Sequence, residues 1–301
     1  MSWQLYRWTW RLEAPLHVGI APAGSLNRCR LYVPARALWG ALTAELARQE
    51  AGSGDPDYPA VGERLRKDAR FTYLYPAEYD GREWRAWLPR YEEDKGLVWK
   101  REDRRDDDDG LSDRKMRARL VSTRAATAID PNSDTAAEGS LRETECINTH
   151  WRNEDGTPAG PVALKGYVLT RAEGEPNLAK LETISVGGDS RYGLGRLRRI
   201  AGMEADSRIF RLDVTCEQEQ PVVAADTLLA HGQVNSQPKD NANKGNGNAP
   251  AAIIGDQEAI GGWDYDRNVI QRIASTLWSP GSRAQSPARW IITAEGTWSL
   301  S

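Results

Sequence analysis

Residues 6–14 alternate between two kinds of side chain, and this pattern constrains the fold more than any other feature of the 301-residue chain. Apolar side chains occupy the even positions, among them Trp8, Trp10 and Leu12, while arginine, threonine and glutamate occupy the odd positions between them. A period of two is typical of a half-buried β-strand. The segment therefore predicts a strand with one aromatic face toward the core and one charged face.

A helix is expected after this strand. Residues 16–30 are rich in Gly, Ala, Ser and Asn and predict a loop, and Pro34 then precedes apolar residues at helical spacing. Leu38, Trp39 and Leu42 belong to that apolar stripe. The same periodicities place Trp8, Trp10 and Trp39 on core faces, so we do not expect these tryptophans to stack on nucleic-acid bases.

The stretch 51–160 is long, charged and irregular in pattern, with strand-like pieces at 84–88 and 141–147. It predicts an insertion. Residues 101–119 surround four consecutive aspartates, 106–109, with arginines. Such a block is typical of a solvated mobile loop, and because these carboxylates lack fixed spacing with partners, an acidic metal site is the weaker interpretation.

Regular patterns return with a predicted strand at 162–170. Asn177 is a candidate N-cap for a short helix that carries Leu178, Leu181 and Ile184. Further strands are predicted at 194–200, at 209–216 and near the end of the chain at 289–294. This order predicts an α+β fold, a ferredoxin-like (RRM-like) β-α-β-β-α-β sheet with helices on one face.

The expected organisation is one ferredoxin-like domain over residues 1–217, with an insertion at about 51–160, followed by a C-terminal extension over 218–301. A degenerate second ferredoxin-like unit is an alternative description of that extension. Within it, the Asn-, Gly- and Lys-rich residues 235–250 form a low-complexity stretch that we expect to be flexible.

Composition excludes several classes of protein. Lys and Arg total 40 against 43 acidic residues, a formal charge of −3, so nucleic-acid contact would require local clusters of basic residues. The cysteines Cys29, Cys146 and Cys216 are widely spaced, which fits a reducing cytoplasm and neither a disulfide framework nor a zinc site. No apolar run is long enough to span a membrane, and the N-terminus does not resemble an export signal. We expect no cofactor and no metal.

Residues 186–197 form a glycine-rich loop with four glycines in nine residues and arginines at Arg191 and Arg196. Glycines allow tight turns and close approach of a ligand to backbone N–H groups, and arginine suits phosphate. The residues after Gly193 do not fit a P-loop, and the dinucleotide fingerprint lacks its third glycine. The loop therefore predicts a cradle for a polyanion, with a ligand-free turn as the alternative.

Three segments in this order resemble the RAMP superfamily, the RNA-binding subunits of CRISPR effector complexes. Residues 15–19, Pro-Leu-His-Val-Gly, together with 31–42 resemble the family's strand-loop-helix opening. Residues 124–141 look like the projecting β-hairpin of type III members, and the glycine-rich loop looks like the family's signature loop. The resemblance covers patches of residues 15–200 and does not extend to the C-terminal third.

The resemblance implies a subunit that grips guide CRISPR RNA, with the glycine-rich loop against phosphates and the hairpin between bases. We expect a non-catalytic subunit of a type III effector complex, most similar to the cap that holds the 5′ handle, with the III-D type as one candidate. Its partners would be the large signalling subunit and the backbone subunits, with target RNA contacted indirectly. The residues expected at the RNA interface are His17, Arg28, Arg30, Arg36, Arg124, Gly187, Gly188, Arg191, Tyr192, Gly193, Gly195 and Arg196.

The alternative function is a RAMP ribonuclease, either a target-cleaving backbone subunit or a repeat-processing endonuclease. Some relatives move a 2′-hydroxyl proton with a histidine, but a lone histidine such as His17 is more often structural. Target-cleaving subunits use an aspartate in the first loop, where this chain has no carboxylate and carries Asn27. An amide is neither a general base nor an equivalent metal ligand, so we expect no catalysis.

Overall fold

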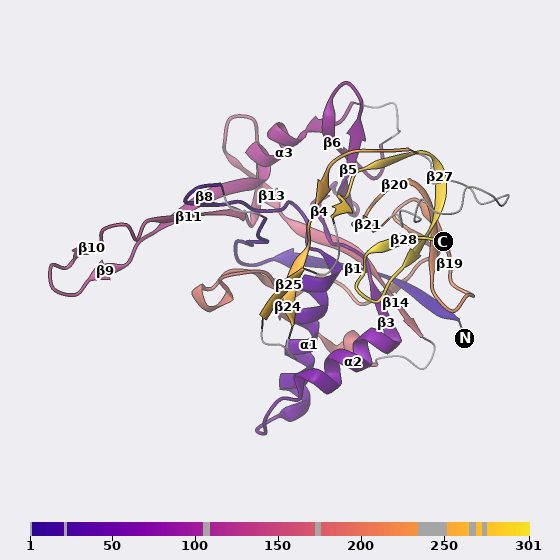
Figure 1. Cartoon of the computed structure of the whole chain (residues 1–301), viewed down its shortest axis with the longest axis horizontal. Coiled ribbons are helices and arrows are strands. Elements are labelled where there is room, and N and C mark those ends of the chain that lie inside the picture. The colour runs from indigo at the N-terminus through magenta and orange to yellow at the C-terminus, as the bar shows by residue number, and fades with distance from the viewer. Residues whose placement is uncertain are drawn as a thin grey trace, which may run out of the picture.

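The computed structural model describes residues 2–20, 23–104, 109–171, 176–233, 252–264, 269–272 and 276–301. They form an α+β fold with two large, mostly antiparallel sheets, three α-helices and a long arm that projects from the body (Figure 1). Among these residues, none of the helices is both long and apolar enough to cross a membrane. The predicted low-complexity residues 235–250 lie outside the described ranges.

The first sheet has ten strands in the order β15-β16-β1-β14-β4-β5-β6-β7, with β17 beside β1 and β3 beside β14. β1 lies between β14 and β16 and is antiparallel to both, and β4 is antiparallel to β14. The ten strands are β1 (Trp3–Leu12), β3 (Ala69–Phe71), β4 (Tyr75–Tyr79), β5 (Trp84–Glu92), β6 (Gly96–Arg101), β7 (Leu111–Ser112), β14 (Ala163–Arg171), β15 (Thr183–Ser185), β16 (Arg196–Arg199) and β17 (Glu204–Ala205).

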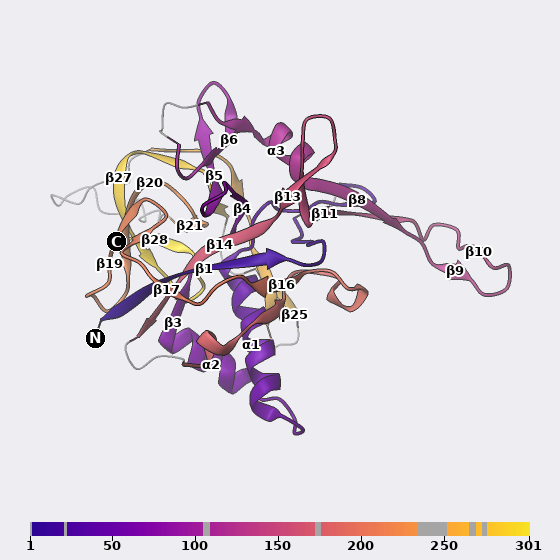
Figure 2. The same ribbon diagram turned by 180° about the vertical axis from the view of Figure 1, so that it is seen from behind.

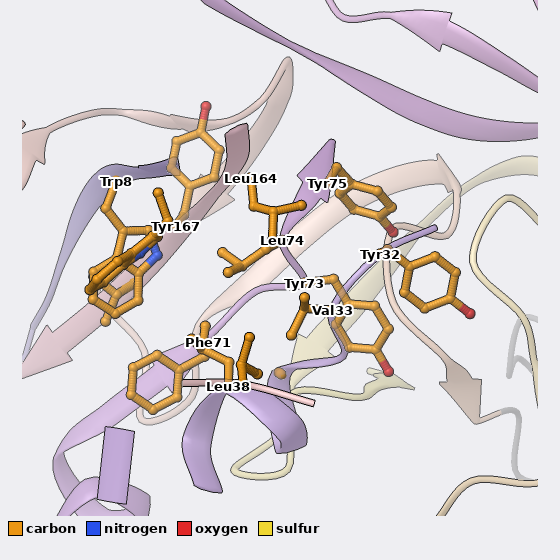
Figure 3. Close-up of a cluster of buried hydrophobic side chains, with 14 of the residues drawn as sticks. Trp8, Tyr32, Val33, Leu38, Phe71, Tyr73, Leu74, Tyr75, Leu164 and Tyr167 are labelled. Carbon is orange, nitrogen blue, oxygen red and sulfur yellow. The ribbon is translucent and has the colours of Figure 1, made fainter. Parts of the chain in front are cut away.

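The alternation in the first strand is confirmed. Trp8, Trp10 and Leu12 are buried, whereas Arg11 is exposed and Arg7 pairs with Glu204. The predicted helix is also confirmed, as α1 (Ala35–Ala51), which begins after Pro34 and buries Leu38. Trp8, Leu38 and Phe71 meet in one apolar cluster with the tyrosines of the neighbouring strands (Figure 3).

The stretch 51–160 is more regular than its sequence pattern indicates. It contains α2 (Tyr58–Asp68) and α3 (Asp113–Leu120), and β3 and β4 pair directly with β14 inside the first sheet. The expectation of a mobile loop over 101–119 is wrong for the part occupied by α3, because Met116 and Leu120 are buried and Ser112 caps the helix through the N–H of Lys115. Three of the four consecutive aspartates, 106–108, lie outside the described residues.

The arm is a twisted antiparallel ribbon built mainly from β8 and β11, and both views show it extending away from the sheets (Figures 1 and 2). Its base also includes the short β2, parallel to β11. The segment 124–141 is therefore a projecting hairpin. The strands of this region are β2 (Leu26–Asn27), β8 (Val121–Ala126), β9 (Ile129–Asp130), β10 (Thr135–Ala136), β11 (Arg142–Ile147), β12 (His150–Arg152) and β13 (Pro158–Pro161).

The second sheet has nine strands in the order β18-β19-β20-β27-β28-β21-β26-β23, with β22 beside β27, and β24 and β25 form a separate hairpin. Residues 289–292 of the predicted strand at 289–294 are part of β27, residues 293–294 belong to the turn after it, and β28 follows. These strands are β18 (Arg208–Ile209), β19 (Leu212–Thr215), β20 (Val222–Thr227), β21 (Gly232–Gln233), β22 (Ile253–Ile254), β23 (Gln257–Glu258), β24 (Gly261–Asp264), β25 (Val269–Arg272), β26 (Leu277–Trp278), β27 (Arg283–Ile292) and β28 (Trp298–Leu300).

Two predictions need correction, the helix before the glycine-rich loop and the strand at 209–216 after it. The expected helix at Asn177 is only a 3₁₀ turn, η1 (Pro176–Lys180), and Ile184 lies on β15, paired with Leu197 of β16. The glycine-rich loop thus follows a strand. Pairing with β16 satisfies backbone groups that would stay without partners at the ends of so short a helix. The predicted strand at 209–216 is broken at Phe210, whose φ of 55° turns the chain between β18 and β19.

The two sheets meet through a polar junction formed by Arg30, Tyr32, Tyr73, His231 and Glu258. The Nε2–H of His231 donates to Glu258 (2.7 Å), and its Nδ1 accepts from the hydroxyl of Tyr73 (2.6 Å). Glu258 also accepts from Arg30 and from Tyr32 (3.1 Å). Burial raises the pKa of Glu258, but the hydrogen bond from His231 and the charge of Arg30 outweigh burial and lower that pKa to about 2.

Candidate nucleic-acid interface

The opening loop, whose described residues are 15–20 and 23–30, is fixed along β11 at the base of the arm. Leu16 exchanges backbone hydrogen bonds with Ile147, and the amide of Asn27 donates to the carbonyl of Glu143 (3.2 Å). Alternate residues of β11 point to opposite sides. The side chain of Glu145 therefore points to the opening loop, and those of Arg142 and Thr144 point to the opposite side, toward the glycine-rich loop.

Glu145 is the main side-chain anchor of the opening loop. Its carboxylate accepts the N–H of Cys29 (2.8 Å) and the guanidinium of Arg117 (3.3 Å), and Arg117 also donates to the carbonyl of Cys29 (3.1 Å). The backbone carbonyl of Glu145 accepts Nδ1–H of His17 (2.8 Å). Side chains thus satisfy both peptide groups around Cys29 on one edge, and an antiparallel bridge to Gly19 holds the same residue on the other edge.

The glycine-rich loop, residues 186–197, packs directly on the opening loop. The N–H of Gly195 donates to the carbonyl of Pro15 (2.8 Å), and the N–H of Gly188 donates to the carbonyl of His17 (2.9 Å). Gly187 and Gly195 have φ of +88° and +77°, and an added Cβ would lie 2.3 Å from the oxygen of His17 and 1.9 Å from that of Val186. Only glycine fits these two positions. Two segments far apart in the sequence therefore form one unit, which we call the loop assembly.

An open pocket of ≈650 Å³ lies between the glycine-rich loop and the base of the arm. Tyr192 is 75% exposed beside it, with the guanidinium of Arg142 5.3 Å from its ring centre. Arg142 also lies 3.4 Å from the carboxylate of Asp189. Arg124 of β8 and Leu194 of the glycine-rich loop also line the pocket. The other lining residues come from β8, β11 and the segment between them, and they are small or hydroxyl-bearing: Ala125, Ala126, Thr127, Ala128, Ser140, Thr144 and Cys146.

Five of the six arginines predicted at the interface fall into two groups. Arg28, Arg124 and Arg191 are exposed and make no ion pair with any residue in the described ranges. Arg30 is buried in the polar junction, and Arg36 pairs with Glu295 (2.7 Å) in the turn between β27 and β28. We therefore do not carry Arg30 and Arg36 into the proposed site.

Arg196 is exposed but shares a carboxylate with its neighbour. It lies 3.2 Å from Glu13, which also accepts from Arg198. The hydrogen bond from Arg198 and the charges of the nearby arginines lower the pKa of Glu13. Arg11 lies 3.7 Å from the same carboxylate, so one negative charge is shared among three arginines, which leaves this group of four side chains with a net positive charge.

Three of the residues that shape the pocket and the loop assembly were not predicted from the sequence. They are Arg142, Asp189 and Glu145. The alternation along β11 would have separated Glu145 from Arg142, but it could not show which segment each side faces. Among the described residues there is no group of three His, Cys, Asp or Glu side chains that could hold a metal ion.

No protein-family model matches the sequence, and a search of curated proteins finds no match. The fold is similar to that of a chain in the cryo-EM structure of the type III-B Cmr-beta bound to cognate target RNA and AMPPnP, with a TM-score of 0.54 and 14% identity, covering 93% of this chain and 85% of that chain. A second structure of the type III-B Cmr-beta bound to cognate target RNA gives 0.52 and 14%, covering 92% and 86%. At this identity the likeness concerns the fold.

Proposed function

We propose that this chain is a RAMP-type subunit of a type III CRISPR RNA-guided effector complex that binds guide RNA at its 5′ handle without cleaving it. The observation that carries the proposal is the loop assembly, in which backbone hydrogen bonds hold the glycine-rich loop on the opening loop beside the arm. Arg28 and Arg191 in this unit and Arg124 on the arm are exposed and have no ion-pair partner among the described residues, and Tyr192 is exposed as well. Arginine forks suit phosphate oxygens, and a tyrosine ring can stack on a base.

The strand order of the first sheet supports a ferredoxin-like RAMP domain. The four strands β16-β1-β14-β4 are adjacent and antiparallel, and α1 connects β1 to the segment that contains β4. A β-α-β-β-α-β chain produces this 4-1-3-2 order, with the 3₁₀ turn η1 in the place of the second helix. The overall likeness to chains of the type III-B Cmr-beta agrees with this interpretation.

The backbone of the glycine-rich loop adds to the anion site. Asp189 has a φ of 55°, and a short 3₁₀ turn, η2 (Ser190–Tyr192), follows it. The N–H groups of Ser190 and Arg191 have no hydrogen-bond partner within the described part of the chain. Free N–H groups after a left-handed residue make a concave site that suits phosphate.

Ribonuclease activity is the second candidate. It would need a group that accepts a proton from a hydroxyl, and His17 is the histidine within the loop assembly. Its Nδ1 donates to the carbonyl of Glu145, so only Nε2 could accept that proton, and the sequence of the opening loop has no carboxylate to act as a second acid–base group. The lack of this second group favours a binding role for His17.

The test is RNA binding by a charge-reversal variant. Arg124→Glu with Arg191→Glu should lower affinity for a repeat-derived RNA by about 100-fold or more and flatten its salt dependence, whereas Arg48→Glu with Arg208→Glu, at exposed positions outside the loop assembly, should not. Equal affinity of the two variants would contradict the proposal. Specific cleavage of labelled repeat RNA or of a guide–target duplex, with or without Mg²⁺, would establish the ribonuclease instead.

A further inference from the structure

His17 presents one ring nitrogen with no protein partner. Its Nδ1 lies 2.8 Å from the carbonyl oxygen of Glu145. A carbonyl oxygen only accepts hydrogen bonds, so Nδ1 carries the proton and Nε2 of the neutral ring has a free lone pair. Within the described ranges Nε2 makes no hydrogen bond, and it is not one of the buried unsatisfied atoms. It therefore keeps some contact with solvent.

Two glycines leave this edge of the ring uncovered. A Cβ on Gly19 would lie 3.4 Å from Nε2, and a Cβ on Gly188 would lie 3.2 Å from the adjacent Cδ2. Neither glycine has a φ in the left-handed region, so the backbone at both positions is open to ordinary residues. The role of these glycines is therefore to leave space beside Nε2. Neither is needed for an unusual backbone conformation.

An uncovered acceptor selects a ligand group that has a hydrogen to donate. Phosphate oxygens at neutral pH have none, so the phosphate backbone alone cannot satisfy Nε2. The 2′-hydroxyl of ribose can donate, occurs in every nucleotide whatever its base, and distinguishes RNA from DNA. We propose that the Nε2 edge of His17, framed by Gly19 and Gly188, accepts a hydrogen bond from a ribose 2′-hydroxyl and makes this site selective for RNA over DNA.

The proposal rests on the RNA-binding function proposed above and adds the sugar as the recognised group. It is tested with one oligonucleotide sequence made as RNA, as DNA and as 2′-fluoro RNA, at about pH 8, where imidazoles are neutral. The 2′-fluoro sugar keeps an RNA-like pucker but cannot donate. Wild-type protein should bind RNA about two- to tenfold more tightly than the 2′-fluoro form, the range expected for one hydrogen bond.

Two variants remove the site in different ways. His17→Asn keeps a donor for the carbonyl of Glu145 but deletes Nε2, and Gly188→Ala keeps the histidine but covers its edge. Both should bring the RNA to 2′-fluoro affinity ratio close to one. The matched controls His150→Asn and Gly202→Ala should keep the wild-type ratio, because His150 is exposed on β12 and Gly202 faces open space.

The outcomes separate the two proposals. Wild-type protein that binds no RNA in a salt-dependent manner would overturn the proposed function. Wild-type protein that binds all three forms equally, or a His17→Asn protein that keeps the preference, would overturn only the role of His17. A preference that follows changes of base rather than changes of sugar would replace the ribose with a base donor.

Discussion

The loop assembly and the polar junction use arginine in opposite ways. Arg28 and Arg30 are two residues apart in the opening loop, yet Arg28 is exposed without an ion-pair partner among the described residues, and Arg30 is buried against Glu258. Every titratable group of the polar junction has a partner within it. An arginine near a candidate site is thus available to RNA only where no carboxylate of the protein has bound it.

The two regions should therefore respond differently to mutation. Substitutions in the polar junction should lower stability and leave RNA recognition by the folded protein unchanged. Substitutions at the exposed residues of the loop assembly should weaken RNA binding and leave stability unchanged. The glycines that join the glycine-rich loop to the opening loop are the exception, because their backbone atoms both stabilise the fold and shape the candidate site.

The largest effect is expected from Gly195→Ala. Its Cβ would lie 1.9 Å from the carbonyl oxygen of Val186 at a φ of +77°, so the backbone must move. We expect a loss of about 4 kcal/mol of unfolding free energy, or no folded protein at all. Gly193→Ala is the matched control, with a φ of +82° and open space around its Cβ, and should lose about 1–2 kcal/mol. Urea unfolding of the two variants distinguishes steric overlap from backbone strain, and equal losses would contradict this account.

Glu258→Ala should produce the next largest effect. It leaves the buried guanidinium of Arg30 without its carboxylate, and breaking such a pair costs about 3 kcal/mol. The salt dependence of RNA binding should stay as in the wild type. Glu13→Ala is the surface counterpart, since Glu13 pairs with the exposed Arg196 and Arg198. It should leave the denaturation midpoint almost unchanged and strengthen RNA binding, and a stability loss as large as that of Glu258→Ala would remove the distinction between the two regions.

Arg191→Ala should weaken RNA binding by about 1–2 kcal/mol and reduce the salt slope by about one ion, whatever the RNA sequence. Unfolding free energy should not change, because Arg191 is exposed. Filter binding across a range of salt concentrations measures both quantities. Arg208→Ala, on β18 and paired with Asp213, is the control that should change neither. An unaltered slope for Arg191→Ala would exclude this residue from the site.

The sequence predicted the elements whose pattern depends on local spacing. The alternation around Trp8 and the helical stripe through Leu38 each determine which face is buried, and the structure confirms both. The sequence pattern predicted the helices and strands of residues 51–160 less well. The short strands of this region include charged residues, such as Arg70 and Glu78, that interrupt the apolar pattern, and β3 and β4 are buried only because β14, far away in the sequence, pairs with them.

The candidate site was likewise predictable only in the features that depend on residue type and order. Residue types and order indicated that the opening loop and the glycine-rich loop belong to one site, and the hydrogen bonds from Gly188 and Gly195 join them. The sequence could not distinguish Arg28 from Arg30, because the carboxylate that binds Arg30 comes from β23, more than two hundred residues later. Ion pairing over such a separation depends on the fold and leaves no local pattern.

The smallest effect concerns pH and belongs to the polar junction. Burial lowers the pKa of His231, and the hydrogen bond to Glu258 opposes this only in part. The unfolded chain therefore binds a proton more readily than the folded chain, so stability is complete above the ordinary histidine pKa and falls as pH decreases through it. One proton limits the change to less than about 1.4 kcal/mol per pH unit. Urea unfolding at pH 7 and about pH 6 should show this decrease in the wild type and a smaller one in His231→Gln. An equal decrease in both proteins would mean that the histidine is not the group that makes the junction sensitive to acid.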